Sequence, residues 1–383
     1  MPITHGIGAF PNSFLDGVWE TGWQELYERF HWLRAMDGVR QDSVFHGEGD
    51  VLTHTKMVCE MLMQLPEWQQ MDELTKNILF TAALLHDVAK PFCTKTEDNK
   101  ITSRGHALKG EILARKLLYK EGGAEKPVPV AIREKIVKLV RFHGLPVAFL
   151  EKENPVRAVL EASQMVRLDW LAVLAKADAM GRYCPDQQDL LAKINLFIEF
   201  CQEQDCYRER RQFADDYSRF IYFQKENGDP AYQAYDATKV EVILLAGLPA
   251  AGKDTWIANN CSHLPVISLD KLREELKVSP VGEQGYVVQT AKERARQFLR
   301  ARQPFVWNAT NLTKKLRRQL IGLFSDYGAS VKLVYLEAPY EEILKRNQAR
   351  SRCVPKNVID RMIDKLEVPD LTEAYKVQWS ISR

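Results

Sequence analysis

The feature that most restricts the fold of this chain is a glycine-rich turn in its second half. An apolar, β-branched run at 240–245 leads directly into Gly247–Lys253, with the sequence GLPAAGK, and a helical pattern follows. A turn of this kind needs glycines, because the backbone must bring its amide groups around an anion. Further short apolar runs alternate with helical patterns downstream, at 265–269, 305–308 and 330–336. The alternation predicts an α/β domain with a parallel sheet over 239–383.

The first part of the chain has a different periodicity. From Trp19 to about Phe223, apolar residues recur at spacings of three and four, and we find no convincing alternating strand. This pattern predicts an all-α domain over 1–225, and a break at Gly228-Asp229-Pro230 places a linker at 226–238. Two domains suit a chain of 383 residues. The clearest helical segments are Val51–Leu65, Leu74–Lys90, His106–Tyr119, Ile132–His143, Ser163–Arg182 and Asp189–Cys201.

Charge also separates the two parts. Residues 1–238 carry 29 Lys and Arg against 35 Asp and Glu, whereas residues 239–383 carry 24 against 16. A basic second part suits a polyanionic partner. The apolar runs are too short to cross a membrane, and the N-terminal residues lack the pattern of a signal peptide. Seven cysteines without any CxxC pair predict reduced thiols and a cytoplasmic location.

Histidine and aspartate residues of the first part lie on core-facing positions of the predicted helices. His54, for example, shares a face with Val51 and Val58. Any one such histidine could be a core residue that bonds a carbonyl group, but buried charges must be compensated. The whole set suits one or two divalent transition metal ions, which could activate water and neutralise phosphate oxygens. Its members are His54, His86, Asp87, His106, His143 and Asp178.

The order of these residues resembles the HD superfamily of metal-dependent phosphohydrolases, over roughly residues 45–182. The resemblance implies one metal held by His54, His86, Asp87 and Asp178. It implies a second metal held by Asp87, His106 and His143. It also gives Asp87 and Lys90 catalytic roles, with Lys90 contacting phosphate, although a helix-end lysine reaching for solvent is the structural alternative. His46 and Glu48 could line the mouth of the site or cap the next helix.

The glycine turn of the second part has the composition of a nucleotide-binding loop. Gly247 and Gly252 would let the backbone wrap the phosphates of ATP, and Lys253 would add a positive charge. Asp254 stands where Ser or Thr usually binds Mg²⁺, so either Asp254 or Thr255 could take that role. A chance glycine turn is the alternative.

Charged residues at the ends of the later strands extend this site. Asp270 follows the second apolar run and could accept a proton from an attacking hydroxyl group, and Arg273 could bind a phosphate of the acceptor. The alternative for this pair is a helix cap and a surface arginine. Arg346 and Arg350 lie where a lid would close over the nucleotide, and a solvated basic face is their alternative.

Together these motifs resemble the 5′-hydroxyl polynucleotide kinase family, over about 239–368. The matching segments are GLPAAGKDTW, Asp270-x-x-Arg273, Thr310-Asn311 and Arg346-Asn347-x-x-Arg350. The resemblance implies catalytic roles for Asp270, Lys253 and Arg350. It implies ATP, or another nucleoside triphosphate, with Mg²⁺ at Gly247, Gly252, Lys253, Asp254, Thr255, Arg346 and Arg350. It implies acceptor contacts by Arg273, Thr310 and Asn311, although Ala309 departs from the acidic residue of the phage relatives.

The order of the two modules is similar to that of the bacterial HD-domain polynucleotide kinases, which heal the ends of RNA or DNA. This implies removal of 3′-phosphate, 2′-phosphate and 2′,3′-cyclic phosphate ends by the first part, and ATP-dependent phosphorylation of 5′-OH ends by the second. Such ends would then suit a nucleic-acid ligase. Two alternatives remain: an HD nucleotidase fused to a nucleoside or metabolite kinase, and a non-catalytic, nucleotide-gated binding module.

Overall fold

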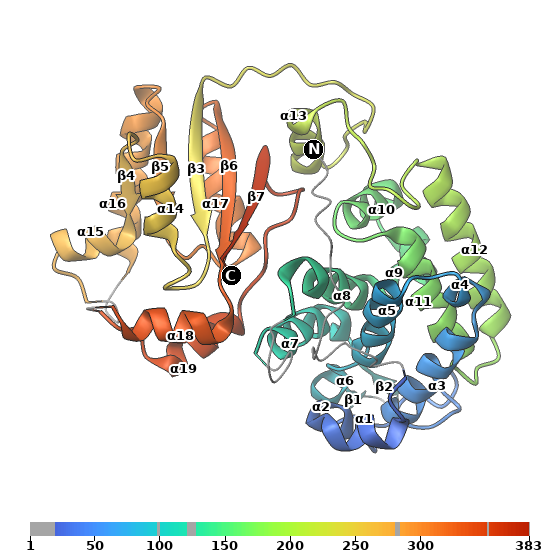
Figure 1. Cartoon of the computed structure of the whole chain (residues 1–383). Coiled ribbons are helices and arrows are strands. Elements are labelled where there is room, and N and C mark those ends of the chain that lie inside the picture. Colours follow the sequence, from blue (N-terminus) through green and yellow to red (C-terminus); the bar gives the residue numbers. More distant parts are fainter. Residues whose placement is uncertain (1–19, 98–99, 121–127, 280–283, 351, 383) are drawn as a thin grey trace. The chain divides into compact units, whose positions relative to one another are not determined.

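A computed structural model of the chain describes residues 20–97, 100–120, 128–279, 284–350 and 352–382 (Figure 1). It divides into two compact units, Met1–Arg211 and Gln212–Arg383. All seven cysteines lie within the described residues, and each is a free thiol. Among the described helices, none combines the length and the apolar character needed to cross a bilayer.

The first unit is built from helices around a central one that is buried from Asn77 to its end. That helix, α5, carries apolar side chains all around its axis, and Ile78, Ala82 and Leu85 are completely buried. Such a helix needs neighbours on every side, and α3, α8 and α11 pack against it. The described helices of this unit are α1 (Trp23–Arg29), α2 (His31–Arg34), α3 (Val51–Gln64), α4 (Pro66–Gln69), α5 (Glu73–Leu85), α6 (Lys90–Cys93), α7 (His106–Lys120), α8 (Val130–Phe142), α9 (Leu145–Ala148), η1 (Phe149–Glu151), α10 (Pro155–Ser163), α11 (Leu168–Met180) and α12 (Gln187–Glu203).

Two features of this unit differ from the sequence expectation. A short antiparallel hairpin, β1 (Lys95–Glu97) and β2 (Lys100–Thr102), lies in a region where no strand was expected. The helical stretch predicted at 163–182 corresponds to α11, which begins five residues later, at Leu168, because Ser163 is the last residue of the separate helix α10. The described residues of this unit are nevertheless helical or irregular apart from that hairpin and the isolated bridge between Arg40 and Asp50.

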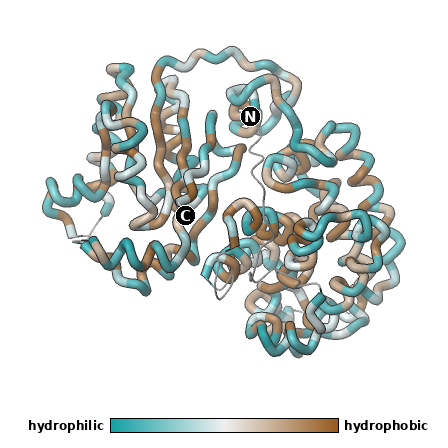
Figure 2. Tube along the Cα trace, in the orientation of Figure 1, coloured by the Kyte–Doolittle hydropathy of each residue, from teal (hydrophilic) through white to brown (hydrophobic). Residues whose placement is uncertain are grey.

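The second unit contains the predicted parallel sheet. Its strands are β3 (Val240–Ala246), β4 (Val266–Ser268), β5 (Phe305–Asn308), β6 (Ala329–Glu337) and β7 (Lys376–Ile381). They lie in the order β4-β5-β3-β6-β7, and every pair is parallel. The central strand β3 is buried except at Glu241, and Figure 2 shows it as hydrophobic. This order makes β3 the point where the chain switches direction across the sheet, which is where open α/β sheets bind ligands.

Helices connect the strands and cover the sheet. Helices α14, α16 and α17 pack against β5, β4 and β6, respectively. The described helices of this unit are α13 (Asp216–Gln224), α14 (Lys253–Asn260), α15 (Leu269–Glu275), α16 (Gly285–Arg300), α17 (Lys314–Ser325), α18 (Tyr340–Gln348) and α19 (Lys356–Ile363).

The boundary between the units lies earlier than the expected 1–225 domain and 226–238 linker. Helix α13 belongs to the second unit, because Arg219 donates hydrogen bonds to the carbonyl oxygens of Leu371 and Tyr375. The segment after it is largely exposed but makes two contacts with the same unit: Ala234 N donates to Ser218 Oγ, and the Tyr375 hydroxyl donates to Asp236. Polar composition suggested a linker here, but its polar groups have partners in the second unit.

Candidate functional site

The six residues proposed as metal ligands come together at one end of the first unit. His54 lies one turn into α3, whereas His86 and Asp87 directly follow α5. His106 begins α7, His143 directly follows α8, and Asp178 lies in α11. Five helices therefore each supply one or two side chains to a single centre.

Asp87 is at the middle of this centre. Its Oδ2 lies 3.1 Å from His86 Nε2 and 3.8 Å from His54 Nε2, and its Oδ1 lies 3.4 Å from His106 Nε2. Beyond it, His54 Nε2 lies 3.1 Å from Asp178 Oδ1, and the Nε2 atoms of His106 and His143 are 3.2 Å apart. Two groups of nitrogen ligands thus share one carboxylate.

The donor set fits a divalent ion. The buried Asp87 Oδ1 has no hydrogen-bond partner among the described residues, although buried carboxylate oxygens nearly always have one. Imidazole nitrogens and carboxylate oxygens within reach of one another occur, among the described residues, as three overlapping groups: His54–His86–Asp87, Asp87–His106–His143 and His46–Glu48–His54. Such a mixed nitrogen and oxygen set is typical of sites for zinc and other transition metals.

The opposite ring nitrogens of the histidines are all held by oxygen atoms. The Nδ1 atoms of His86, His106 and His143 lie 2.7, 2.8 and 2.8 Å from the carbonyl oxygens of residues three positions earlier, namely Ala83, Ser103 and Val140. A hydrogen bond at Nδ1 fixes the tautomer and leaves the Nε2 lone pair free for a metal. The burial of His143, with the nearby imidazole of His106, lowers its pKa to about 3, so this ring is neutral and ready to act as a ligand.

From the sequence, Glu48 could either line the mouth of the site or cap the next helix, and the structure shows its contacts. Its Oε1 lies 3.0 Å from His54 Nδ1 and 2.8 Å from His46 Nδ1, and its Oε2 accepts a hydrogen bond from Tyr183 N. Glu48 therefore holds His54 from behind, while Asp50 is the residue that caps α3, accepting from Thr53 N. The Tyr183 contact spans 135 residues, so no local pattern could show it.

Two basic side chains offset the carboxylates of the centre. Lys90 Nζ lies 2.7 Å from Asp87 Oδ2, and Arg182 contacts both oxygens of Asp178 at 2.6 and 2.7 Å. Burial alone would raise the pKa of Asp87, but Lys90 and His86 more than offset this and hold it well below its usual value. Lys90 is buried, which excludes the alternative of a solvated lysine. Sequence reasoning missed Arg182, although its spacing of four from Asp178, just beyond the end of α11, was a usable signal.

The glycine-rich loop of the second unit, Gly247–Lys253, has the backbone conformation that its glycines predict. Gly247 and Gly252 have φ values of 145° and 93°, and a Cβ at Gly247 would lie 2.3 Å from the carbonyl oxygen of Leu336. Lys253, the first residue of α14, donates to the carbonyl oxygens of Gly247 and Leu248 at 3.0 and 2.8 Å. The ammonium group is therefore folded back under the loop, and burial lowers its pKa to about 8, although Asp254 and Asp270 act in the opposite direction.

Asp254 has a partner that sequence reasoning did not assign. Its Oδ1 accepts a hydrogen bond of 2.7 Å from the amide of Asn308, the last residue of β5. Strand β5 does not end in an aspartate. Its last residue, Asn308, instead supplies an amide group that orients the Asp254 carboxylate. This contact favours Asp254 over Thr255 as the residue oriented toward the strand ends.

Asp270 and Arg273 occupy one face of the short helix α15. Arg273 contacts Asp270 Oδ1 at 2.5 Å and also donates to Gln284 Oε1 at 2.6 Å. Asp270 follows β4 directly after Leu269, so it stands at the same edge of the sheet as the loop after β3. Its electrostatic effect on Lys253 agrees with this placement.

The remaining residues of the set divide into exposed and buried ones. Arg346 lies beside the loop, because a Cβ on Gly252 would be 4.0 Å from its Nη1, and Arg350 is exposed after α18. Thr310 accepts a hydrogen bond from Gly247 N through its carbonyl oxygen. Asn311 does not fit the expected acceptor contact: it is 2% exposed, and its amide donates to the carbonyl oxygen of Leu245. Its geometry is that of a support for the loop.

Comparison with known proteins agrees with this division. A family model described as an HD domain matches residues 51–172, and one described as an AAA domain matches 242–369. The chain therefore joins a helical HD domain to a P-loop domain of the kinase type.

Individual relatives resemble only part of the chain. The L-seryl-tRNA(Sec) kinase of Methanococcus maripaludis is 25% identical over 142 residues, which are 35% of this chain and 55% of that protein. The chain thus spans about half the length of this curated relative. Solved structures with a similar fold include a sugar kinase from Janibacter sp. HTCC2649 (16% identity, 37% of this chain and 85% of that chain, TM-score 0.30). A gluconokinase from Sinorhizobium meliloti is also similar (18% identity, 38% and 83%, TM-score 0.28).

Proposed function

We propose that this protein is a bifunctional enzyme that heals the ends of RNA or DNA. The observation that carries the proposal is the pairing of two sites in one chain: histidine groups that share Asp87, and a phosphate-binding loop that shares a sheet edge with Asp270 and Arg273. The first site suits hydrolysis of phosphate esters, and the second suits transfer of a phosphoryl group. A strand break that ends in a 2′,3′-cyclic phosphate and a 5′-OH needs both reactions before ligation.

In the HD domain, the protein's own residues would hold the ions and the phosphate. His54, His86 and Asp178 would bind one ion and His106 and His143 a second, with Asp87 between them. Divalent ions there lower the pKa of bound water and neutralise phosphate oxygens. Lys90, 2.7 Å from Asp87, is placed to contact a phosphate oxygen at the edge of the centre. By this route the domain would remove 3′-phosphate, 2′-phosphate and 2′,3′-cyclic phosphate groups.

In the P-loop domain, the backbone amides around Gly247–Gly252 and the Lys253 ammonium would bind the β- and γ-phosphates of ATP. Asp254, held by Asn308, would face the Mg²⁺ that accompanies the nucleotide. Asp270 would accept the proton of the 5′-hydroxyl group as that oxygen attacks the γ-phosphorus, and ADP would leave. Arg346 and Arg350 would neutralise the transferring phosphoryl group.

A nucleic-acid acceptor is favoured over a small metabolite by charge. The part of the chain after residue 238 carries 24 basic against 16 acidic residues, and Arg273 adds a guanidinium beside Asp270. Guanidinium groups bind phosphates through charge-assisted hydrogen bonds, which a neutral sugar acceptor would not use. The curated relative is itself named as a kinase of a seryl-tRNA, an acceptor that contains nucleic acid.

The test is one oligonucleotide with a 5′-OH and a 3′-phosphate, incubated with ATP and a panel of divalent metals, with both ends analysed. Asp87→Asn should abolish loss of the 3′-phosphate and leave 5′ phosphorylation near the wild-type rate. Lys253→Ala should have the reverse effect. A nucleoside 3′-phosphate serves as the small-molecule acceptor for comparison. Faster phosphorylation of that nucleotide than of the oligonucleotide would favour a metabolite kinase, and loss of both activities from either substitution would contradict two separate sites.

A further inference from the structure

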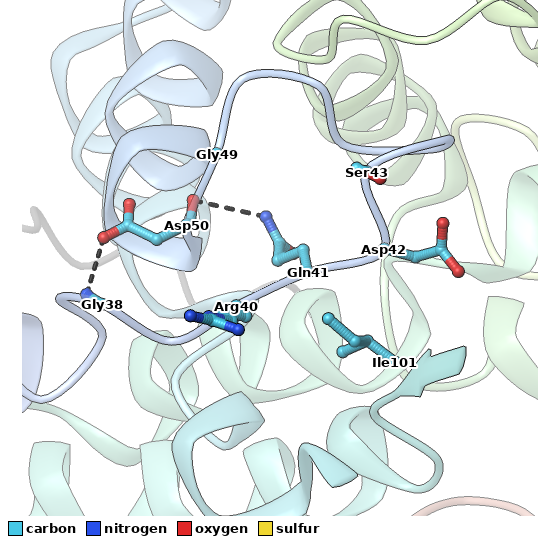
Figure 3. A pocket seen from close by; sticks show the side chains of 8 residues that line it. All are labelled: Gly38, Arg40, Gln41, Asp42, Ser43, Gly49, Asp50 and Ile101. Atoms are coloured by element: carbon cyan, nitrogen blue, oxygen red, sulfur yellow. Dashed lines mark hydrogen bonds between the residues drawn. The ribbon is translucent and has the colours of Figure 1, made fainter. Parts of the chain in front are cut away.

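A hollow in the first unit lies next to the metal-ligand centre and has no assigned role. Its volume is about 520 Å³, within the range of small-molecule binding sites. Figure 3 shows the residues that line it: Gly38, Arg40, Gln41, Asp42, Ser43, Gly49, Asp50 and Ile101. They come from the segment before α3, from the cap of α3 and from β2.

The hollow is connected to the centre through two side chains. Gln41 is buried in its wall, and its Oε1 accepts a hydrogen bond of 2.6 Å from Lys90 Nζ. The same ammonium group lies 2.7 Å from Asp87 Oδ2, the shared carboxylate. A ligand in the hollow is therefore separated from the centre by one lysine and one glutamine. A substituent on a phosphate at Lys90 would enter this space by displacing the Gln41 side chain from Lys90.

The walls are held in place by the backbone. Arg40 and Asp50 form an antiparallel bridge, Val51 N donates to Val39 O, and Asp50 caps α3 while also accepting from Gly38 N. Because α3 carries His54 one turn later, the wall and the ligand are parts of one rigid assembly. Gly38 and Gly49 border open space, since a Cβ on either would meet no atom within 4 Å, and their φ values of 68° and 121° favour glycine.

The lining has the chemistry of a nucleotide site. Arg40 is exposed, and within the described ranges no carboxylate pairs with its guanidinium group. Ile101 supplies an apolar surface, and Asp42 and Ser43 supply groups that can bind ribose or base hydrogen-bonding atoms. A guanidinium group at the rim suits a second phosphate on the same strand.

We propose that this hollow receives the terminal nucleoside of a nucleic-acid 3′ end whose phosphate lies at the metal-ligand centre, and that Arg40 contacts the next phosphate along the strand. The proposal rests on the proposed function of the HD domain and names the part of the substrate that this domain recognises. It makes the HD activity selective for chains over single nucleotides.

Three substrates separate these contacts. p-Nitrophenyl phosphate has no nucleoside, a nucleoside 3′-phosphate has no second phosphate, and a dinucleotide 3′-phosphate with a 5′-fluorescein block has both. The block keeps the 5′ end from the kinase site. Arg40→Gln should raise KM about tenfold for the dinucleotide only, as expected for a lost charge-assisted contact. Ser43→Trp, which fills the hollow, should raise KM for both nucleotides and leave p-nitrophenyl phosphate unchanged. Arg208→Gln, an exposed arginine outside the lining, is the matched control.

The outcomes distinguish this inference from the function on which it rests. If the KM values of the variants changed equally for all three substrates, or did not change, the inference would be overturned. Hydrolysis of the nucleotides by the wild-type protein would still support the HD activity. Failure of the wild-type protein to hydrolyse either nucleotide would contradict the activity itself. In that case, fluorescence anisotropy of the blocked dinucleotide with the intact chain still tests the hollow. Binding that Arg40→Gln and Ser43→Trp both leave unchanged would overturn it.

Discussion

Arg273 Nη1 lies 2.5 Å from Asp270 Oδ1, so the proposed general base and the proposed ligand of the acceptor phosphate form an ion pair with each other. The pair spans less than one turn of α15 and is partly exposed, so its net contribution to stability is small. The ion pair instead serves to orient the two side chains, because each one fixes the direction of the other. An arriving acceptor would exchange this contact for a phosphate on Arg273 and a hydroxyl group on Asp270.

Replacement of the base is the first prediction. Asp270→Asn keeps the size of the side chain but cannot take the hydroxyl proton, so the kcat of phosphorylation should fall by about 10²–10⁴. ATP affinity and removal of 3′-phosphate should persist, which steady-state kinetics and nucleotide titration would show. Undiminished turnover would mean that Asp270 serves only as the ion-pair partner of Arg273, since Ser268 is the residue that caps α15.

Loss of the guanidinium group should affect the acceptor. Arg273→Ala should raise the acceptor KM by an amount that corresponds to roughly 1.5–3 kcal/mol, with little change in the KM for ATP. Because the two residues touch, the double variant with Asp270→Asn should lose less than the sum of the single losses. An equal rise in both KM values would assign Arg273 a structural role.

The buried Lys253 makes ATP binding depend on pH. Burial lowers its pKa to about 8, so the free protein loses this positive charge as pH rises through that value. The charged form binds phosphates, so ATP affinity should be constant at lower pH and fall above pH 8 by up to about tenfold per pH unit. Calorimetric titration between pH 7 and about 9.5 would measure this. Lys253→Arg keeps its charge throughout, and its profile should be flat; a wild-type profile equally flat would contradict the role of the lysine.

The contact behind His54 predicts a change in metal affinity. Glu48→Gln removes the charge that holds His54 Nδ1, and loss of such an outer partner typically weakens metal binding about 10–100-fold. Competition with a chelator dye would give the affinity directly. Glu60→Gln, on the exposed side of the same helix, is the control and should bind metal as the wild type does. Equal metal affinity in the two variants would show that Glu48 does not support metal binding.

A buried ion pair behind the phosphate loop predicts a loss of stability. Arg317 is fully buried, binds both oxygens of Glu373 at 2.7 and 2.8 Å, and donates to the carbonyl oxygen of Asn311. Arg317→Met leaves Glu373 uncompensated and should lower the free energy of unfolding by about 3–5 kcal/mol, measured in urea. The exposed pair Arg294–Glu275 should cost no more than about 1 kcal/mol when broken. A small loss at Arg317 would show that the interior there admits water.

Sequence patterns predicted the elements with strong local signals. The run at 305–308 coincides with β5, and the predicted Val51–Leu65 helix matches α3 to within one residue, because Asp50 supplies a cap where the apolar period begins. The hairpin was not predicted because its strands have three residues each, and those of β1 are all exposed, so burial imposes no alternation. Strand β7 was also missed, since it pairs with one neighbour only and is largely half-exposed.

At the candidate site, sequence predicted which residues gather but not what supports them. The six ligands were visible because each lies on an apolar helix face. The roles of Asn308 and Asn311 depend on partners 54 and 66 residues away, and Glu48, which holds the nearby His54, is itself held by Tyr183 N, 135 residues away. Nothing local in the sequence records such distances. The resemblance of Thr310-Asn311 to the motif of the kinase family implied an acceptor contact for Asn311. Its φ of 45° turns the side chain toward Leu245 instead.

The hydrogen bonds between α13 and the segment before β7 determine where this protein can be divided into fragments. Arg219 satisfies the carbonyl oxygens of Leu371 and Tyr375, which lead into the last strand. A fragment that began at Val240 would start with an intact first strand yet leave those oxygens without their donor, and its final strand would be free to fray. A fragment intended to contain the whole second unit should therefore begin at Gln212, about one helix before the sheet itself.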